Sequence, residues 1–317
     1  MLAIRLDRGA VLLRHQPKPR RPAGFALIRL LYGGICNTDL ELQRGYYGFR
    51  GTPGHEFVGE VVEADTARWV GQRVVGEINL ACGRCDWCVR GLGRHCPKRT
   101  VLGIVKHPGA FRELLTLPER NLWRVPGEIA TEHAVFIEPL AAACEILEQV
   151  RIPKGAQVAV LGDGKLGLLI GQVLHASGGE VHQYGHHKDK LKLAADVGID
   201  ARLARKLPKG KYTWVVDATG SSEGLGTAVQ MAQPRGTVVM KSTVHGMVAI
   251  DSAPVIVNEI TLVGSRCGRF GPAIKLLKDR RVQVDRLISD VLPLQKAPLA
   301  FRHAVTPGAL KILLQPR

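Results

Sequence analysis

The sequence predicts a two-domain α/β protein, with a doubly wound parallel sheet in one domain and a β-rich fold in the other. The length of 317 residues exceeds the roughly 250 to 300 at which a single hydrophobic core stops growing. Short apolar segments broken by Gly and Pro fill the first part of the chain, and from Gln157 the pattern changes to strand, glycine turn, helix and strand. These two patterns predict two domains of different class.

Residues 1–138 are expected to form the β-rich domain. Its expected strands, each bounded by turn residues, are ALIRLLYGGI, FVGEVVEA, RVVGEIN and FRELLTL. The next stretch, TEHAVFIEPLAAACEILEQV, has helical spacing and ends before the turn signal IPKG. It therefore predicts a helix that links the two domains.

Residues 139–270 are expected to form the parallel-sheet domain. Its expected strands are QVAVLGDG, EVHQYG, YTWVVDATG, GTVVMKS and EITLVGS, and KLGLLIGQVLHASG is expected to be a helix. The tail, residues 271–317, holds one short helical segment and two apolar segments, which is too little to fold alone. We expect it to return to the first domain.

Composition excludes several classes of function. Lys and Arg exceed Asp and Glu by 16, which would attract nucleic acid or an anionic membrane surface. The basic residues are scattered, without the basic helix or aromatic stripe of nucleic-acid binders, so neither partner is expected. No apolar run reaches bilayer length, and the start MLAIRLDRGAVLLRHQP lacks the apolar core of a secretory signal. A cytoplasmic protein is therefore expected.

A compact cysteine cluster indicates a structural zinc site. Cys82, Cys85, Cys88 and Cys96 are separated by two, two and seven residues, which suits a loop wrapped around one tetrahedral ion. Four thiolates fill the coordination shell, so such a site would stabilise a lobe and leave no position for a substrate. The alternative, two disulfides, requires an oxidising compartment for which the sequence gives no sign.

Three other residues offer ligands for a second zinc site. Cys36 lies in GGICNTDLE, and His55 with Glu56 lies in GTPGHEFVGE, each at a glycine-rich turn. A thiolate, an imidazole and a carboxylate suit a zinc site with an open position. A lone Cys or His is, however, more often a packing residue than a ligand. On residue type alone, both interpretations stay open.

A glycine motif predicts a dinucleotide site. Gly162, Gly164 and Gly167 follow the apolar strand VAVL and open the helix KLGLLIGQVLHA. Backbone amides at this helix start, with Lys165 and Leu166 beside the turn, would bind a pyrophosphate. A glycine turn without a nucleotide is the alternative, and the strand–turn–helix context makes it the weaker one.

The end of the second strand favours NADP over NAD. An acidic residue is expected there to bind the ribose diol of NAD, but Gly185 occupies that position. His186, His187 and Lys190 follow, and such groups can accept a 2′-phosphate. A solvated basic turn is the alternative. On this interpretation Gly185→Asp would shift the preference towards NAD.

Five motifs follow one another along the chain in the order of a known enzyme family: GGICNTD, PGHEFVGEV, CGRCDWC with Cys96, FIEPLA and VLGDGKLG. In these the sequence resembles the zinc-containing medium-chain dehydrogenase/reductase family over nearly the whole chain, and it is most similar to the branch of threonine, sorbitol and glucose dehydrogenases. The resemblance implies a GroES-like catalytic domain, a Rossmann domain and reversible hydride transfer between NAD(P) and a secondary, polyol or sugar alcohol. It does not identify the alcohol.

The resemblance also implies the roles of single residues. Cys36 and His55 would bind the catalytic zinc, with Glu56 and Glu138 as carboxylate ligands that exchange with water. Thr38 matches the hydroxyl residue that takes the substrate proton. The chain is shorter than typical members between Cys36 and His55, which implies trimmed loops around the substrate.

Further positions carry weaker implications. The resemblance implies that Asp39 orients His55 through the ring nitrogen that faces away from the metal; a turn cap is the alternative. Glu41 stands where many members of the family have a relay histidine. Lys311 matches a basic position near the pyrophosphate, although an isolated lysine is by default a surface residue. The segments 217–220 and 241–243 end later strands, where ligands of open α/β folds bind.

The remaining expectations concern packing and assembly. Cys144 and Cys267 match no ligand position and are expected to be packing residues. The aromatic residues Tyr46, Tyr47 and Phe49 are expected near the substrate pocket, but they do not identify the alcohol. VNEITLVGSR resembles the edge strand that pairs subunits in the family, so a homodimer or homotetramer is expected. Two rival functions remain: a zinc-independent NADPH reductase of the same superfamily that acts on enones or quinones, and a non-catalytic protein that binds nucleotide and zinc.

Overall fold

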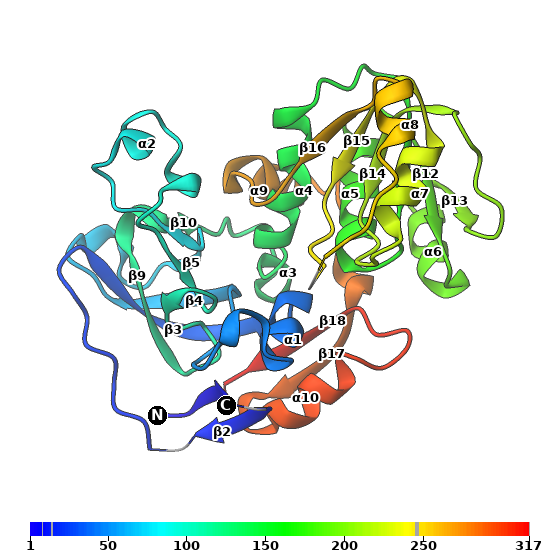
Figure 1. Cartoon of the computed structure of the whole chain (residues 1–317). Coiled ribbons are helices and arrows are strands. Elements are labelled where there is room, and N and C mark those ends of the chain that lie inside the picture. The colour runs from blue at the N-terminus through cyan, green and yellow to red at the C-terminus, as the bar shows by residue number, and fades with distance from the viewer. Residues whose placement is uncertain (8, 14, 245–246, 317) are drawn as a thin grey trace. The chain divides into compact units, whose positions relative to one another are not determined.

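The chain folds into two compact units in the computed structural model, which describes all residues except 8, 14, 245, 246 and 317. Unit 1 comprises Met1–Glu138 and Leu287–Arg317, and unit 2 comprises Pro139–Arg286 (Figure 1). The helix expected over residues 131–150 is interrupted and forms α3 (Thr131–Ala134) and α4 (Ile137–Gln149); α4 begins in unit 1 and continues in unit 2. Among the described residues, no helix is both long and apolar enough to cross a membrane.

A mixed β-sheet forms the centre of unit 1. Its strand order is β10-β5-β4-β3-β18-β17, and β9 also pairs with β3. The pairs are antiparallel except β17 with β18, which is parallel. The bounds are β3 (Phe25–Gly34), β4 (Glu56–Glu63), β5 (Arg73–Gly76), β9 (Leu114–Pro118), β10 (Leu122–Arg124), β17 (Ile288–Pro293) and β18 (Lys311–Gln315).

Smaller elements surround this sheet. Strand β1 pairs with β2, and β7 pairs with both β6 and β8. Their bounds are β1 (Ala3–Leu6), β2 (Ala10–Leu13), β6 (Asn79–Leu80), β7 (Thr100–Leu102) and β8 (Lys106–His107). The helices are α1 (Asn37–Gln43), α2 (Asp86–Val89), α3 (Thr131–Ala134) and α10 (Ala297–His303), with 3-10 turns at Tyr46–Gly48, Ala67–Trp69, Gly93–His95, Glu119–Asn121, Asp285–Leu287 and Leu294–Lys296.

The C-terminal segment joins unit 1 through a shared core. Phe301 of α10 and Ile312 of β18 are buried in the same apolar cluster as Ile35 and Leu40. The Phe301 ring meets the Phe111 ring edge-on, with centroids 6.1 Å apart. Removing this apolar surface from water stabilises the return of the chain to the first unit.

The return to unit 1 begins at Leu287, later than the expected residue 271. Helix α9 (Phe270–Lys278) belongs to unit 2 and buries Phe270, Ala273 and Leu277, which lie on one helical face. Just before it, a Cβ on Gly268 would lie 1.8 Å from the Ala141 carbonyl oxygen of α4. The chain therefore packs tightly within unit 2 until after α9, and this packing moves the boundary.

A parallel sheet forms the centre of unit 2. Its strand order is β13-β12-β11-β14-β15-β16, and all of these pairs are parallel. Counted from β11, this is the order 3-2-1-4-5-6 of the doubly wound dinucleotide fold, with its switch point between β11 and β14. The bounds are β11 (Gln157–Leu161), β12 (Glu180–Gly185), β13 (Asp200–Leu203), β14 (Tyr212–Asp217), β15 (Ala232–Met240) and β16 (Thr261–Gly264). The predicted fold class is confirmed.

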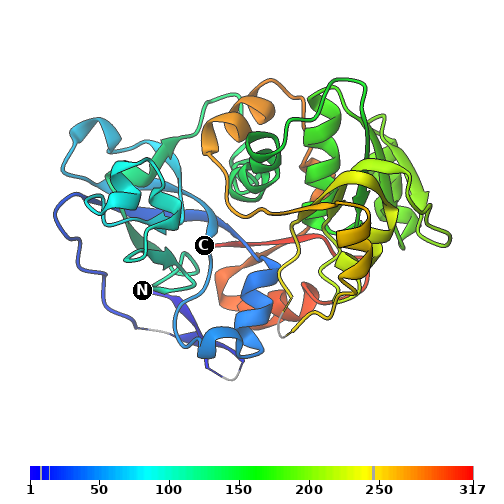
Figure 2. The same ribbon diagram turned by 45° about the horizontal axis from the view of Figure 1, so that its top comes forward.

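Helices pack against this sheet (Figure 2). Helix α5 contacts β11 and β12, α6 contacts β12 and β13, and α7 contacts β14 and β15. Their bounds are α5 (Lys165–Ala176), α6 (Lys188–Ala195), α7 (Gly224–Met231) and α8 (Ala253–Val257). The glycine motif predicted from the sequence lies between β11 and α5, at the carboxyl end of the first strand.

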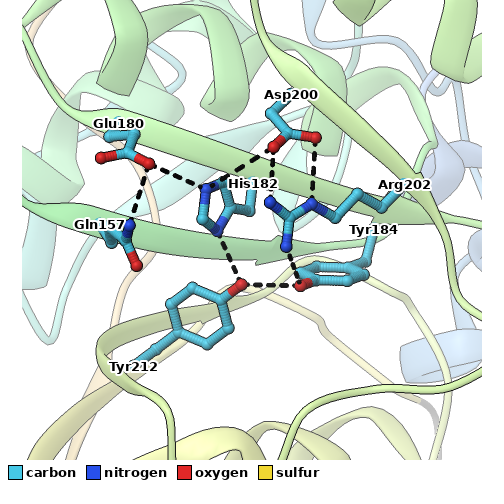
Figure 3. A network of polar contacts seen from close by, with 7 residues as sticks. All are labelled: Gln157, Glu180, His182, Tyr184, Asp200, Arg202 and Tyr212. Atoms are coloured by element: carbon cyan, nitrogen blue, oxygen red, sulfur yellow. Dashed lines mark hydrogen bonds and ion pairs between the residues drawn. The ribbon is translucent and has the colours of Figure 1, made fainter.

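A network of polar side chains crosses the face of this sheet (Figure 3). The His182 Nδ1 atom lies 2.7 Å from the Tyr212 hydroxyl, which lies 2.7 Å from the Tyr184 hydroxyl. Arg202 donates to the Tyr184 hydroxyl at 3.2 Å and to both carboxylate oxygens of Asp200. Since buried polar groups need partners, these bonds favour one alignment of β12, β13 and β14.

We expect this network to make unit 2 less stable in acid. Burial and the Arg202 charge lower the pKa of His182, outweighing Asp200 and Glu180. Because the unfolded chain then binds the proton more readily, the contribution is present above the unfolded-state pKa of about 6.5 and is lost as the pH falls below it. The free energy of unfolding should fall by at most about 1.4 kcal/mol per pH unit for this group.

Urea unfolding near pH 7.5 and pH 5.5 measures this effect in the wild type and in His182→Gln. The variant should lose less stability between the two pH values, because it lacks the titrating imidazole. Equal losses in both proteins would show that other groups cause the acid sensitivity.

Candidate metal centres and dinucleotide site

The clustered cysteines converge on one point in unit 1. Their Sγ···Sγ distances are 3.5 Å for Cys85–Cys88, 3.6 Å for Cys82–Cys96, 3.7 Å for Cys85–Cys96 and 3.9 Å for Cys82–Cys88. A zinc ion bonded to four sulfurs at about 2.3 Å has tetrahedral edges of about 3.8 Å. The cluster therefore has the size of a zinc tetrathiolate site.

The cluster shows thiols and no disulfide. All seven cysteines of the chain are among the described residues, and none of them forms a disulfide. The distances between the clustered sulfurs far exceed the roughly 2.0 Å of a disulfide bond. A backbone hydrogen bond from Arg84 helps to lower the pKa of Cys82 to about 6, which favours the thiolate that binds metal.

A second group of ligand atoms forms where β3 and β4 pair. Cys36 lies between β3 and α1, His55 directly precedes β4, and Glu56 is the first residue of β4. The antiparallel register places Gly34 opposite Glu56, so ligand atoms of Cys36, His55 and Glu56 come within 4.8 Å of one another. His55 and Glu56 are buried, whereas Cys36 is partly exposed. This donor set matches an open zinc site.

Asp39 fastens the two turns that carry these ligands. Its carboxylate, fully buried, accepts the Cys36 amide at 2.9 Å and the Gly54 amide at 3.0 Å. Its Oδ1 atom also lies 3.5 Å from Nδ1 of His55. Both sequence interpretations of Asp39, the cap and the neighbour of His55, thus describe contacts that it makes.

The charges around His55 favour a cation. Burial opposes protonation of the imidazole, but Asp39 and Cys36 outweigh it and raise its pKa well above the usual value. The His55 Nδ1 atom is buried and lies 3.5 Å from Asp39 Oδ1, too far for a full hydrogen bond, and it has no other hydrogen-bond partner among the described residues. A site with acidic groups and an incompletely paired imidazole can be satisfied by a metal ion as well as by protons.

Lys311 completes the surroundings of Glu56. Its ammonium group forms an ion pair with the Glu56 carboxylate, and both side chains are 1% exposed. Burial lowers the pKa of Lys311, but the Glu56, Cys36 and Asp39 charges outweigh it and raise the pKa, so the ammonium form persists. A Cβ on Gly34 would lie 3.0 Å from the Glu56 Oε2 atom, and glycine there leaves room for the pair.

The interpretation of Lys311 as a surface residue was wrong. It stands on β18, which pairs on one side with β3 and on the other with β17, and its neighbours Leu310 and Ile312 are buried. A strand between two others has little access to water. The signal in the sequence was a single charge inside the apolar run ALKILL.

Other predicted residues lie at varying distances from this group. The Thr38 hydroxyl is 3.7 Å from the Cys36 sulfur. Glu138 stands in the first turn of α4 and is not part of the ligand group. Glu41 pairs with Arg44. Tyr46 and Phe49 pack against the apolar core, and the side chain of Tyr47 lies outside the described part of the structure. Cys144 and Cys267 belong to neither ligand group.

The glycine motif of unit 2 needs its glycines for close backbone contacts. Gly162 has a φ of +111°, and a Cβ there would lie 2.4 Å from the Ala218 carbonyl oxygen. A Cβ on Gly167 would lie 2.2 Å from the Gly162 carbonyl oxygen. Gly164, the N-cap of α5, faces open space, so a ligand can approach the backbone there. Lys165 and Leu166 are the first residues of the helix.

Hydrogen bonds connect the carboxyl ends of the later strands β14, β15 and β16. Asp217 accepts hydrogen bonds from the Thr219 amide at 3.0 Å and from the Ser242 hydroxyl at 3.1 Å. Lys241 is buried and donates to the Ser265 hydroxyl at 2.9 Å and to the Arg266 carbonyl at 2.6 Å. These contacts join the ends of β14, β15 and β16, so both segments have a structural role.

The end of β12 contains a contact that the sequence did not predict. Gly185 is followed by the exposed residues His186 and His187, and Lys190 lies within the first turn of α6. The Asp163 carboxylate, from inside the glycine motif, accepts the His186 and His187 amides at 2.7 Å each. Asp163 stands in a variable position of the motif, so no pattern indicated this role.

Comparison with known proteins agrees with these two units. Residues 22–127 match the family described as "Alcohol dehydrogenase GroES-like domain" and residues 166–279 match "Zinc-binding dehydrogenase". A sorbitol dehydrogenase of Halalkalibacterium halodurans is 30% identical over 97% of this chain and 96% of its own length.

Two solved structures share the fold over almost their entire length. An alcohol dehydrogenase, RspB, of Escherichia coli in complex with the cofactor NADH has a TM-score of 0.90 and 26% identity, with 99% of each chain covered. A zinc-binding dehydrogenase of Sinorhizobium meliloti bound to NADP has a TM-score of 0.88 and 28% identity, with the same coverage. The chain belongs to the zinc-containing medium-chain dehydrogenase/reductase family of alcohol dehydrogenases.

Proposed function

We propose that this protein is a zinc-dependent alcohol dehydrogenase that transfers hydride reversibly between NAD(P) and a secondary alcohol of polyol or sugar type. The convergence of Cys36, His55 and Glu56 in unit 1 is the observation that carries the proposal. Unit 2 has the strand order and glycine turn of a dinucleotide-binding domain. We therefore assign catalysis to unit 1 and coenzyme binding to unit 2, and the sorbitol dehydrogenase among the relatives supports the alcohol class.

The residues of unit 1 have separate tasks in this proposal. Zinc bound by Cys36, His55 and a carboxylate would polarise the alcohol oxygen as a Lewis acid and lower the pKa of the alcohol. We assign receipt of the substrate proton to the hydroxyl of Thr38, and its position 3.7 Å from the Cys36 sulfur supports this role. Glu56, held by Lys311, and Glu138 are the proposed exchangeable carboxylate ligands.

The coenzyme is assigned to the carboxyl ends of β11 and β12. The pyrophosphate would bind at the turn Gly162–Gly167 and at the first amides of α5, where the helix dipole favours an anion. Lys165 and Leu166 would flank it. The adenosine ribose would lie near Gly185, with His186, His187 and Lys190 around it. NADH and NADP in the two related structures support a nicotinamide dinucleotide.

We propose that the lobe around Cys82, Cys85, Cys88 and Cys96 binds a structural zinc ion, and that losing this ion makes the protein less stable. Cys96→Ser removes the most buried of the clustered thiolates. Because metal binding contributes directly to the folding of such lobes, the variant should lose one zinc ion per chain and become sensitive to proteolysis within residues 80–100. Zinc analysis and limited proteolysis measure this. Wild-type zinc content together with unchanged protease resistance would contradict the assignment.

Edge strand β16 is the proposed contact between subunits. It ends the sheet of unit 2, Leu262 on it is 37% exposed, and Ile256 and Val257 of α8 are 72% and 79% exposed. An open strand edge with apolar side chains favours pairing with a second copy. We therefore propose a homodimer or homotetramer. Seven cysteines without a disulfide also fit the reducing cytoplasm, to which we assign the protein.

A dehydrogenase assay tests the proposed function. The purified protein is incubated with NAD⁺ or NADP⁺ and a panel of polyols and sugars, and the absorbance of the reduced coenzyme is followed before and after treatment with a chelator. We expect turnover of a polyol or sugar that chelation abolishes. NADPH-dependent reduction of enones or quinones that survives chelation would instead identify the zinc-independent reductase. Coenzyme binding without any turnover would identify a non-catalytic protein.

A further inference from the structure

The volume next to Gly185 is already filled. A Cβ built on Gly185 would lie 2.4 Å from the Asp163 Oδ2 atom and 2.5 Å from its Cβ and Cγ atoms. The position at the end of β12 therefore lacks a side chain of its own because the side chain of Asp163, from the turn after β11, lies across it. The end of the second strand has no carboxyl group of its own, and the carboxyl group of Asp163, from the turn after the first strand, lies next to it.

Asp163 is held firmly in this place. Its Oδ2 atom accepts the His186 and His187 amides at 2.7 Å each, and the His187 Nδ1 atom lies 3.1 Å from both carboxylate oxygens. The residue is only 7% exposed. Of the side chains that the sequence offered as acceptors of a 2′-phosphate, His187 is thus engaged by an internal anion.

Asp163 carries a negative charge at neutral pH. Burial opposes its ionisation, but the hydrogen bonds from His187 and His186 outweigh the effect and lower its pKa. Both backbone amides donate to Oδ2 of Asp163, whereas Oδ1 is near only the His187 ring nitrogen among these contacts. A carboxylate oxygen can accept more than one hydrogen bond. It can therefore accept the hydroxyls of a ribose diol, whereas a 2′-phosphate would meet a like charge.

We propose that Asp163 takes the role of the strand-end acid and makes the coenzyme site selective for NAD over NADP. This inference rests on the proposed function, because it needs a dinucleotide at the glycine turn. It reverses the NADP preference expected from the sequence, since that expectation depended on the absence of a carboxylate at this position.

The same geometry changes what Gly185→Asp should do. A second carboxyl group at 185 would overlap with Asp163 and place two negative charges side by side. We expect this single variant to bind both coenzymes more weakly. The double variant D163G/G185D, in which the carboxylate moves from the turn to the strand end, avoids the overlap.

Calorimetric titration with NAD⁺ and NADP⁺, in the absence of any alcohol, tests the inference without relying on turnover. The wild type should bind NAD⁺ more tightly. Asp163→Gly and the isosteric Asp163→Asn should raise the affinity for NADP⁺ relative to NAD⁺ by roughly tenfold or more, because one like charge is removed. D163G/G185D should restore the NAD preference.

A matched control removes a nearby charge that has no contact with this position. Asp189 is exposed in the first turn of α6, and Asp189→Asn should leave the ratio of the two dissociation constants unchanged. Tighter binding of NADP⁺ by the wild type, or the same ratio in the wild type and both Asp163 variants, would overturn the inference alone. If the wild type bound neither coenzyme, the dinucleotide site and hence the proposed function would fail as well.

Discussion

Cys36→Ser is expected to remove one of two zinc ions per chain and to lower kcat/KM by about a thousandfold or more, which corresponds to about 4 kcal/mol of transition-state stabilisation. Cys36 is the only thiol in its ligand group. A hydroxyl is a much poorer zinc ligand than a thiolate. With His55 and a carboxylate left, the site would hold the ion too weakly to activate an alcohol.

Elemental analysis and steady-state kinetics on the same preparations check this result. Cys144→Ser is the matched control, because Cys144 is a buried thiol in α4 that belongs to neither ligand group. It should keep both ions and most of the activity. If Cys36→Ser kept two zinc ions and wild-type turnover, the assignment of the catalytic metal to this group would be wrong.

In the metal-free protein, Lys311→Met should lower the free energy of unfolding by about 3 to 5 kcal/mol, because it leaves the Glu56 carboxylate buried without its cationic partner. The pair is almost completely removed from water, so solvent cannot replace the lost ammonium group. Exposed ion pairs behave differently. Lys275→Met, which breaks the exposed pair with Asp279, should change the free energy of unfolding by less than about 1 kcal/mol.

A double-mutant cycle separates the ion pair from a simple packing effect. E56Q/K311M removes both charges, and it should be more stable than Lys311→Met alone because no charge is left unpaired in the interior. The stabilities are measured by calorimetric unfolding. A double variant that is destabilised by the sum of the two single changes would show that Lys311 contributes through packing and not through Glu56.

The two ligand groups differ in how far the sequence alone could define them. The cysteine cluster lies within fifteen consecutive positions, from Cys82 to Cys96, so its spacing already constrains its geometry. The group of Cys36, His55 and Glu56 depends on the register between β3 and β4. Its residues were identified through the resemblance to a family, because no local pattern relates a turn after one strand to the start of the next.

The sequence by itself determined the fold class, the division into two units, the cysteine cluster and the glycine turn, since each depends on residues close together in the chain. Only the tertiary structure decided the burial of Lys311 against Glu56, 255 positions away, and the placement of Asp163 over Gly185. It also decided that α9 stays with unit 2. In each case the physical reason is the same: the charge or apolar face of one segment is satisfied by a neighbour that strand pairing or helix packing brings close, and local sequence patterns do not specify that neighbour.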